Sequence, residues 1–237
     1  MNLLLLHPED FVAPELVRIS GRRHRHLTDI LQVEPGQALR AGLLDGKLGE
    51  ARVIVRTAGH TDLSVALTAS PPAPLPFTLL LALPRPKALP RILQGVAAFG
   101  INRGFLLNTA RVDKSYWSSP LLCAAALHEQ LLLGLEQARD TRLPEVLLRP
   151  RFRPFVEDEL PQLAAGSLGL AAHPDSGRPC PCAVSQPVTL AIGPEGGFIP
   201  FEVDLLQAQG FLPVQLGTRP LRVESAVPAL LGRLLPA

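Results

Sequence analysis

Leu190-Ala-Ile-Gly-Pro-Glu-Gly-Gly-Phe198 is the most informative stretch of this sequence. Its first residues continue an alternation of apolar side chains that begins at Val188, which is typical of a buried strand, and the glycines and proline then stop any regular element. Pro200 and Glu202 suit the first turn of a helix. Strand, glycine-rich turn and helix is the order found at ligand sites of α/β sheets, although a turn without a ligand fits the same residues.

The composition indicates a globular protein that sits in a reducing compartment. Apolar residues make up 47% of the 237 residues and aromatic residues only 5%, so Leu, Val and Ala must fill the core. No apolar run approaches the roughly 20 residues of a membrane span, and the apolar start at Met1–Leu6 lacks the basic flank of a signal peptide. The 3 cysteines are an odd number without metal-site spacing. We therefore expect a cytoplasmic protein with no membrane contact, no disulfide framework and no metal.

The expected elements divide the chain into three parts. Residues 1–70 hold a short helical pattern, His24–Val33, and several short strands, which predict a small β-barrel. Residues 71–76 are a proline-rich, extended linker. In residues 77–237 strands alternate with helices, which predicts an α/β fold with a mainly parallel sheet. The expected strands are Leu3–Leu6, Ala38–Leu44, Lys47–Val55, Leu63–Thr68, Phe77–Leu83, Gly104–Asn108, Glu145–Leu148, Ser167–Ala172, Val188–Ile192 and Pro213–Leu216.

Positive charge is concentrated in the middle of the chain. Residues 73–156 contain 11 Lys/Arg and 5 Asp/Glu, a net charge of +6, whereas residues 1–72 are balanced and residues 157–237 carry a net −4. Such an excess is typical of a surface that binds a polyanion, and an ordinary solvated surface is the alternative.

Three turns follow the last three expected strands. They are Ala172–Gly177, Gly193–Gly197 and Leu216–Ala226. Because the carboxyl ends of parallel strands lie at one edge of a sheet, the three turns can converge on one pocket. The pocket would offer backbone amides, the carboxylate of Glu195, and a pair of charged residues from the third turn, Arg222 and Glu224.

Several separated motifs point to one family. Ile192–Phe198, Gln209–Gly217 and Leu221–Ala226 resemble the C-terminal motifs of the bacterial 16S ribosomal RNA uracil-N3 methyltransferases, a family of the SPOUT superfamily. Upstream, Glu136–Glu145 and His24–Gly36 resemble further segments of that family. The likeness covers nearly the whole chain in the same order, so it is far more specific than the glycine-rich turn alone.

The resemblance implies an architecture and an activity. Members of the family have an N-terminal PUA-like β-barrel and a C-terminal α/β domain with a trefoil knot, and they act as homodimers. They bind S-adenosyl-L-methionine and methylate N3 of a uridine in 16S rRNA, so the implied partner is 16S rRNA or the small ribosomal subunit.

The resemblance also implies roles for residues of the pocket. Arg222 would stabilise charge on the uracil carbonyls, and Glu224 would orient Arg222 or accept a proton, so these two are the expected catalytic residues. An ordinary salt bridge at a helix start is the alternative reading of the pair. Glu195 would either contact the cofactor or cap the following helix. The expected cofactor-binding residues are Ala172, His173, Ile192, Gly193, Pro194, Glu195, Gly196, Gly197, Leu216, Gly217, Leu221, Arg222 and Ala226.

Basic residues in both domains are the expected RNA contacts. Tyr116 and Trp117 adjoin two of them and would either stack on an unpaired base or pack against a partner chain or helix. The expected RNA-binding residues are Arg22, Arg23, Arg25, Arg85, Lys87, Arg111 and Lys114.

Three positions depart from the family pattern. Gly95 stands where the family usually has lysine, Ala98 where it has glutamate, and Asp140 where it has arginine. These departures leave two alternatives open. One is a non-catalytic RNA-binding or ribosome-assembly protein with the same fold, and the other is a methyltransferase for another rRNA or tRNA nucleotide.

Overall fold

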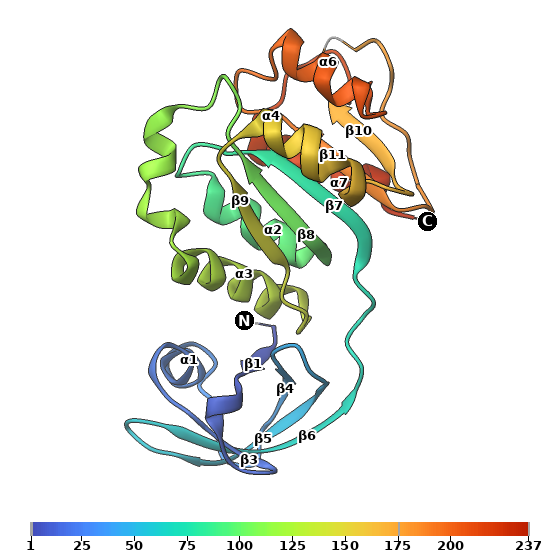
Figure 1. The fold of residues 1–237 in the computed structure, drawn as a ribbon. Coiled ribbons are helices and arrows are strands. Elements are labelled where there is room, and N and C mark those ends of the chain that lie inside the picture. The colour runs from blue at the N-terminus through green and yellow to red at the C-terminus, as the bar shows by residue number, and fades with distance from the viewer. Residues whose placement is uncertain (1, 175, 237) are drawn as a thin grey trace. The chain divides into compact units, whose positions relative to one another are not determined.

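The chain folds into two compact units, shown in Figure 1. The structure is a computed structural model that describes residues 2–174 and 176–236. The first unit comprises Met1–Ala73 together with Leu132–Leu143, and the second comprises Pro74–Leu131 and Pro144–Ala237. A segment from the middle of the chain, the end of helix α3 (Ala124–Ala138) and the residues after it, therefore packs with the first unit.

The first unit is built on one curled sheet of six described strands. Their order is β1-β4-β5-β6-β3-β2, with β1 parallel to β4 and the other pairs antiparallel. Leu27, from the short helical segment, packs with Val17, Ile19 and Leu63 in the core of this unit. The strands are β1 (Leu4–Leu6), β2 (Phe11–Ala13), β3 (Leu16–Ile19), β4 (Ala38–Leu43), β5 (Leu48–Arg56) and β6 (Thr61–Ala69), and the helical segments are η1 (Pro8–Asp10), α1 (Gly21–Arg25) and η2 (His26–Ile30).

Two strands of this sheet, β2 and β3, are absent from the sequence-based expectation. They are short, and Pro14 separates them, so neither shows a sustained alternation of apolar residues. The β4–β5 hairpin, in contrast, turns at Asp45-Gly46, between the expected strands Ala38–Leu44 and Lys47–Val55, with Gly46 N–H donating to Leu43 O at 2.7 Å. Asp45 has a φ of 55°, a left-handed conformation that aspartate tolerates in such turns.

The segment after α3 packs on this hairpin. Thr141 is fully buried, and its hydroxyl donates to Gly46 O at 2.6 Å. Leu143 N–H donates to Asp45 Oδ1 at 2.8 Å. Asp140 Oδ1 accepts the N–H groups of Thr141 at 2.6 Å and of Arg142 at 3.1 Å. Asp140, one of the three departures, thus shapes the backbone of the first unit.

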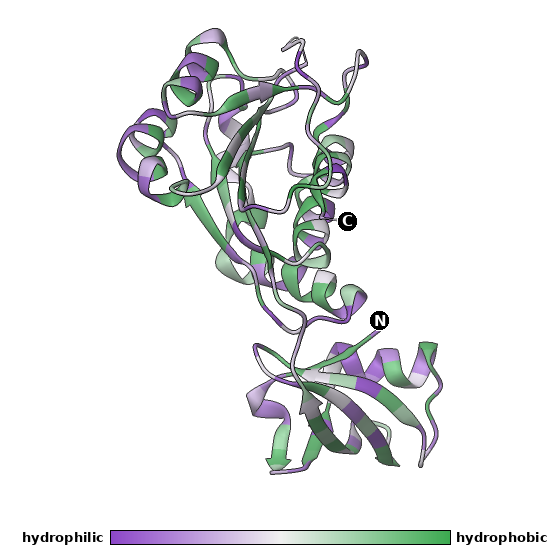
Figure 2. Ribbon diagram, turned by 90° about the vertical axis from the view of Figure 1, so that its right-hand side faces the viewer, coloured by the Kyte–Doolittle hydropathy of each residue, from purple (hydrophilic) through white to green (hydrophobic). Residues whose placement is uncertain are grey.

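The second unit has a parallel sheet at its centre, as the alternation of strands and helices predicts. Six described strands lie in the order β12-β10-β11-β7-β8-β9, and every pair among them is parallel. The hydrophobic run in β7 lies between β11 and β8 and is buried on both faces. Figure 2 shows long hydrophobic stretches, in green, in the strands and helices of this unit. The strands are β7 (Leu75–Ala82), β8 (Ile101–Leu107), β9 (Glu145–Arg149), β10 (Leu168–Ala172), β11 (Val188–Ile192) and β12 (Leu212–Val214).

Helices cover both faces of this sheet (Figure 1). On one side Phe155 and Leu206 pack with Leu80, Phe105 and Phe211 in a continuous core. On the other side lies α2, whose buried face repeats at helical spacing, with α7 against it. The helical segments of this unit are α2 (Leu89–Ala98), η3 (Lys114–Ser118), η4 (Pro120–Leu122), α3, α4 (Phe152–Pro154), η5 (Phe155–Glu159), α5 (Leu160–Leu163), α6 (Pro200–Ala208) and α7 (Val223–Leu234).

The loop between β10 and β11 is tied to the C-terminal part of the chain. Cys180 N–H donates to Gln215 O at 2.8 Å, just after β12. Further along the loop, Ala183 N–H donates to Arg233 O and Val184 N–H to Leu234 O, each at 3.0 Å, at the end of α7. The loop thus contacts the chain on both sides of α7. No helix within residues 2–174 and 176–236 is long and apolar enough to cross a membrane.

Candidate active site at the carboxyl edge of the parallel sheet

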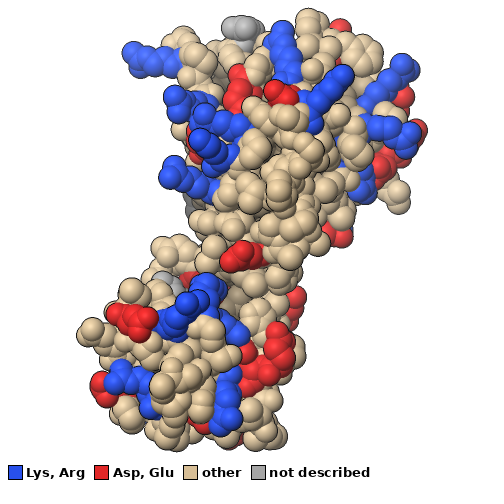
Figure 3. All heavy atoms as spheres, turned by 90° about the vertical axis from the view of Figure 1, so that its left-hand side faces the viewer, with Lys and Arg blue, Asp and Glu red and all other residues tan. Residues whose placement is uncertain are grey.

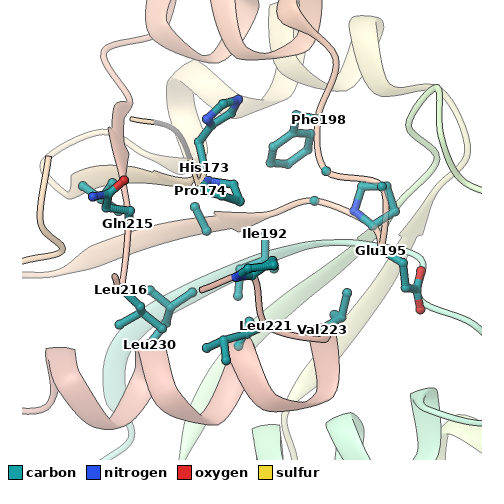
Figure 4. Close-up of a pocket in the computed structure, with 18 of the residues that line it drawn as sticks. His173, Pro174, Ile192, Glu195, Phe198, Gln215, Leu216, Leu221, Val223 and Leu230 are labelled. Atoms are coloured by element: carbon teal, nitrogen blue, oxygen red, sulfur yellow. The ribbon is translucent and has the colours of Figure 1, made fainter. Parts of the chain in front are cut away.

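A pocket opens where β10, β11 and β12 end, and its cavity volume is about 250 Å³. Its walls are the turn after β10, the glycine-rich turn after β11, the segment after β12, and the first two turns of α7. The three turns that the sequence predicts to converge therefore do so. In Figure 4, His173 and Phe198 lie across the pocket from Leu221, Val223 and Leu230.

Nearly all the expected cofactor-binding residues line this pocket. Arg222 is the exception, because its side chain is exposed at the N-terminus of α7 and is not part of the lining. The expected residues that do line the pocket are Ala172, His173, Ile192, Gly193, Pro194, Glu195, Gly196, Gly197, Leu216, Gly217, Leu221 and Ala226.

The pocket also has lining residues that the sequence did not single out. Val223 and Leu230 lie at helical spacing from the expected residue Ala226 on α7, so the periodicity of that helix is a signal by which they could be found. No comparable signal marks the others, since they line the pocket only because the turns fold back on one another. The additional lining residues are Pro174, Phe198, Val214, Gln215, Arg219, Pro220, Val223 and Leu230, joined by Arg111 from the loop after β8.

The glycine-rich turn is closely packed at two positions, against backbone at Gly193 and against a flexible side chain at Gly196. A Cβ on Gly193 would lie 2.9 Å from Phe198 N, and a Cβ on Gly196 would lie 3.0 Å from Arg111 Cδ. Gly197 has a φ of +71° and its N–H donates to Pro194 O at 2.8 Å. The absence of side chains leaves backbone atoms as part of the pocket wall.

Glu195 does not cap the helix that follows it. The α6 cap is Glu202, whose Oε2 accepts the N–H of Ile199 at 3.0 Å. Glu195 Oε1 instead accepts the backbone N–H of Arg85 at 3.2 Å, from the loop after β7. The helix-cap reading of Glu195 is therefore wrong, and its side chain connects the glycine-rich turn to a neighbouring loop.

Glu224 forms its ion pair with Arg85, whereas the sequence suggested Arg222 as its partner. Arg222 is the N-cap residue of α7, and its carbonyl accepts the N–H groups of Ser225 at 2.9 Å and Ala226 at 2.8 Å. The hydrogen bond from its own backbone N–H, then the hydrogen bond and charge of Arg85, hold the pKa of Glu224 below its ordinary value, with a smaller contribution from the charge of Arg222 and against the effect of desolvation. Glu224 is therefore a carboxylate at neutral pH.

The basic residues expected to bind RNA differ in what they contact. Arg23 donates to Asp10 Oδ1 and Oδ2 at 2.7 and 2.6 Å, so its guanidinium is engaged inside the first unit. Arg22 forms an ion pair with the buried Glu136 at 2.7 Å. Arg111 donates to Gly196 O in the pocket wall.

The other expected RNA contacts lie on the surface. On the face of the second unit drawn in Figure 3, Lys and Arg side chains gather along one margin with few acidic side chains among them. The exposed residues of the expected set include Arg25, Lys87 and Lys114.

The remaining departures from the family pattern lie outside the pocket. Gly95 and Ala98 are on α2, and neither belongs to the pocket lining. A Cβ on Gly95 would meet open space. These two positions therefore do not shape the cavity wall. Among the described residues no group of His, Cys, Asp and Glu could hold a metal ion.

Comparisons with known proteins agree with this geometry. The model of the RNA methyltransferase domain family matches residues 71–235. Ribosomal RNA small subunit methyltransferase E of Treponema pallidum is 30% identical over 240 residues, which cover 95% of this chain and 87% of that protein. The protein of the same name from Mycobacterium bovis is 28% identical over 235 residues, which cover 90% of this chain and 84% of that protein.

Solved structures share the fold over the whole chain. A Legionella pneumophila protein with the cofactor SAM bound has a TM-score of 0.77 and 24% identity, covering 97% of this chain and 95% of that one. Ribosomal RNA small subunit methyltransferase E of Neisseria gonorrhoeae, bound to S-adenosyl methionine, has a TM-score of 0.77 and 22% identity. The match covers 98% of this chain and 95% of that one. The match to the RNA methyltransferase domain and the 30% identity to the Treponema protein identify the chain as a member of the ribosomal RNA small subunit methyltransferase E family of RNA methyltransferases.

Proposed function

We propose that this protein transfers a methyl group from S-adenosyl-L-methionine to N3 of a uridine in 16S rRNA. The observation that carries the proposal is the pocket at the ends of β10, β11 and β12, which the family motifs line together. The names of the relatives from Treponema pallidum and Mycobacterium bovis support a small-subunit rRNA substrate. The SAM-bound Legionella and Neisseria structures share the fold that forms the pocket.

The residues of the pocket fit this cofactor. The cavity of about 250 Å³ is close to the lower end of small-molecule pockets, which run from roughly 300 Å³. Ile192, Leu216 and Leu230 form an apolar surface suited to a flat adenine ring, and the backbone around Gly193 can approach a ligand closely because no side chain intervenes. Arg111 and Glu195 provide groups of both signs, as a ligand with an amino group and a carboxylate requires.

The chemistry divides between the cofactor and the chain. When bound, S-adenosyl-L-methionine supplies an electrophilic methyl group. N3 of uracil carries a proton and is a poor nucleophile until that proton leaves, so the protein must favour the N3 anion. We assign Arg222 to stabilise the negative charge that develops on the uracil carbonyls, because a preorganised cation is most effective there.

Glu224 is better suited to hold the start of α7 in place than to accept a proton. Its pKa is lowered, first by the hydrogen bond from its own backbone N–H and then by Arg85, and a carboxylate of low pKa is a weak base. We assign Glu224 to fix the start of α7 next to the substrate.

The first unit and the basic surface would bind the RNA. We assign the curled sheet of the first unit to a PUA-like β-barrel, and the exposed basic residues Arg25, Lys87 and Lys114 to phosphate contacts on 16S rRNA or the small ribosomal subunit. Modification of that RNA would place the protein in the cytoplasm. Contacts of this kind depend on salt, so RNA binding should weaken as ionic strength rises.

A trefoil knot and a homodimer complete the proposal. The loop between β10 and β11 bonds to Gln215 before α7 and to Arg233 and Leu234 at its end, as expected if the C-terminal segment passes through that loop. Sedimentation velocity would test the homodimer, since a monomer at micromolar concentration would contradict it.

The activity is tested by offering the protein its substrate directly. Purified protein is incubated with labelled S-adenosyl-L-methionine and small ribosomal subunits that lack the modification, and the modified nucleotide is identified by mass spectrometry. We expect label at N3 of one uridine in 16S rRNA. Label at another nucleotide would replace the substrate in this proposal, and cofactor binding without transfer to any RNA would favour the non-catalytic alternative.

A further inference from the structure

Arg85, in the loop after β7, bonds to two walls of the pocket at once. Its backbone N–H donates to Glu195 Oε1 at 3.2 Å, in the glycine-rich turn after β11. Its guanidinium forms an ion pair with Glu224, in the first turn of α7. One residue thus links the turn that follows β11 to the helix start that places Val223 and Ala226 in the pocket.

We propose that Arg85 is a positioning residue of the methyl transfer, which acts through Glu224 to hold Arg222 and the first turn of α7 in the reactive geometry. The inference rests on the proposed function. It gives Arg85 a role different from the RNA contact that the sequence predicts.

The ion pair contributes more to geometry than to stability. The side chains of Arg85 and Glu224 are 40% and 21% exposed, and ion pairs with such access to water contribute only about 0–1 kcal/mol. Arg85 Nε and Glu224 Oε2 are also buried without a hydrogen-bond partner among the described residues. A pair that leaves two polar atoms unsatisfied carries a desolvation cost, and such groups are common where function requires them.

The connection runs from a rigid strand to a helix end. β7 lies between β11 and β8, so the loop that carries Arg85 starts from a buried central strand. Glu224 follows Arg222 by two residues, and the carbonyl of Arg222 accepts the first N–H bonds of α7 from Ser225 and Ala226. Holding the Glu224 carboxylate therefore restrains the turn in which Arg222 lies.

The backbone and the side chain of Arg85 can be tested separately. A substitution of the side chain removes the bond to Glu224 and keeps the backbone bond to Glu195. It should therefore loosen the first turn of α7 and leave the glycine-rich turn in place. In Arg85→Met we expect kcat to fall about 100-fold, while the Kd for S-adenosyl-L-methionine, measured by calorimetry, changes by less than about threefold. Arg85→Lys keeps a cation and should recover kcat to within about tenfold of wild type.

A second measurement needs neither RNA nor cofactor. In Arg85→Met, hydrogen exchange of residues 221–230 in the protein alone should be faster than in wild type, because the first turn of α7 has lost its tether. Arg153→Met is the matched control. This variant also removes an ion pair, the one that Arg153 forms with Glu157 at 2.8 Å, and both residues lie outside the pocket lining. It should keep the kcat of wild type and the wild-type hydrogen exchange of residues 221–230.

The outcomes separate this inference from the proposed function. Wild-type kcat in Arg85→Met would overturn the inference, as would an equal loss of cofactor affinity in Arg85→Met and Arg85→Lys, which indicates general damage to the pocket. If wild-type protein transfers no methyl group to any RNA, the proposed function fails. Exchange of residues 221–230 then still tests the tether, and unchanged exchange in Arg85→Met would refute it.

Discussion

Glu202 Oε1 accepts the backbone N–H of Ala110 at 2.7 Å, although the two residues are 92 positions apart in the chain. The other oxygen of the same carboxylate accepts the N–H of Ile199 at 3.0 Å and caps α6. Glu202 is buried, with 3% of its surface exposed. One carboxylate therefore satisfies two backbone donors, in the loop after β8 and at the start of α6.

Replacing this carboxylate should destabilise the second unit. Glu202→Ala leaves two partly buried N–H groups without their acceptor, each a loss of roughly 1–3 kcal/mol in the free energy of unfolding. Urea unfolding followed by circular dichroism would measure the change. Glu202→Gln keeps one acceptor oxygen and should lose about half as much, and an Ala variant as stable as wild type would show that water replaces the carboxylate.

Gly193→Ala should abolish cofactor binding. The added Cβ would lie 2.9 Å from Phe198 N, a backbone atom that cannot move away alone, so the glycine-rich turn must open. Calorimetry with S-adenosyl-L-methionine measures the effect. Gly95→Ala is the control, because its Cβ would meet open space within α2 and alanine favours a helix over glycine by about 1 kcal/mol. Wild-type affinity in Gly193→Ala would contradict the tight packing of the turn.

Arg222→Ala should remove activity and leave the cofactor site in place. The side chain of Arg222 is exposed and not part of the pocket lining, whereas its carbonyl, which any residue retains, starts α7. We expect kcat to fall by about 100-fold or more with the Kd for S-adenosyl-L-methionine within about threefold of wild type. Single-turnover methyl transfer measures the first and calorimetry the second. Full activity in this variant would end the assignment of Arg222.

Arg111→Met should weaken cofactor binding. The guanidinium of Arg111 donates to Gly196 O and its stem packs against the same glycine, so its loss frees one side of the turn. We expect the Kd for S-adenosyl-L-methionine to rise by about tenfold, the loss of one charge-assisted hydrogen bond of roughly 1.5 kcal/mol. Lys114→Met, at the start of η3 and outside the pocket lining, should leave that Kd unchanged. Equal affinities of the two variants would show that the bond does not hold the turn.

Acid should remove a contribution of Asp62 to the stability of the first unit. The hydrogen bond from Arg18 is the main cause that lowers the pKa of Asp62, and the charges of Arg18 and His60 act in the same direction against desolvation. A carboxyl whose pKa is lowered on folding stabilises the protein above the ordinary carboxylate range and loses that effect as pH falls through its folded pKa. In Asp62→Asn, the difference from wild type in free energy of unfolding should therefore shrink between neutral and acid pH. A constant difference across that range would refute the coupling.

Much of the architecture follows from local patterns. The apolar runs at Phe77–Leu83 and Val188–Ile192 predict central strands, and both lie at the middle of the parallel sheet. Parallel order then brings the three turns together, because strand ends share one edge. The strands β2 and β3 escape this reasoning, because both are short and Pro14 separates them, so neither shows a sustained apolar alternation.

The partners of the charged side chains, in contrast, could not be predicted from local patterns. Nothing local to Glu224 indicates Arg85, which is 139 positions away, and a sequence-based view pairs it with the nearby Arg222. The same holds for Arg111 and Gly196, 85 positions apart.

The sequence by itself determined most of the strands, the parallel character of the sheet in the second unit and the turns that form the pocket, because these depend on spacing and on the backbone freedom of nearby residues. The tertiary structure decided which charges meet and where Leu132–Leu143 packs. Those outcomes depend on loops from different strands approaching within hydrogen-bond distance, and no local pattern encodes that distance.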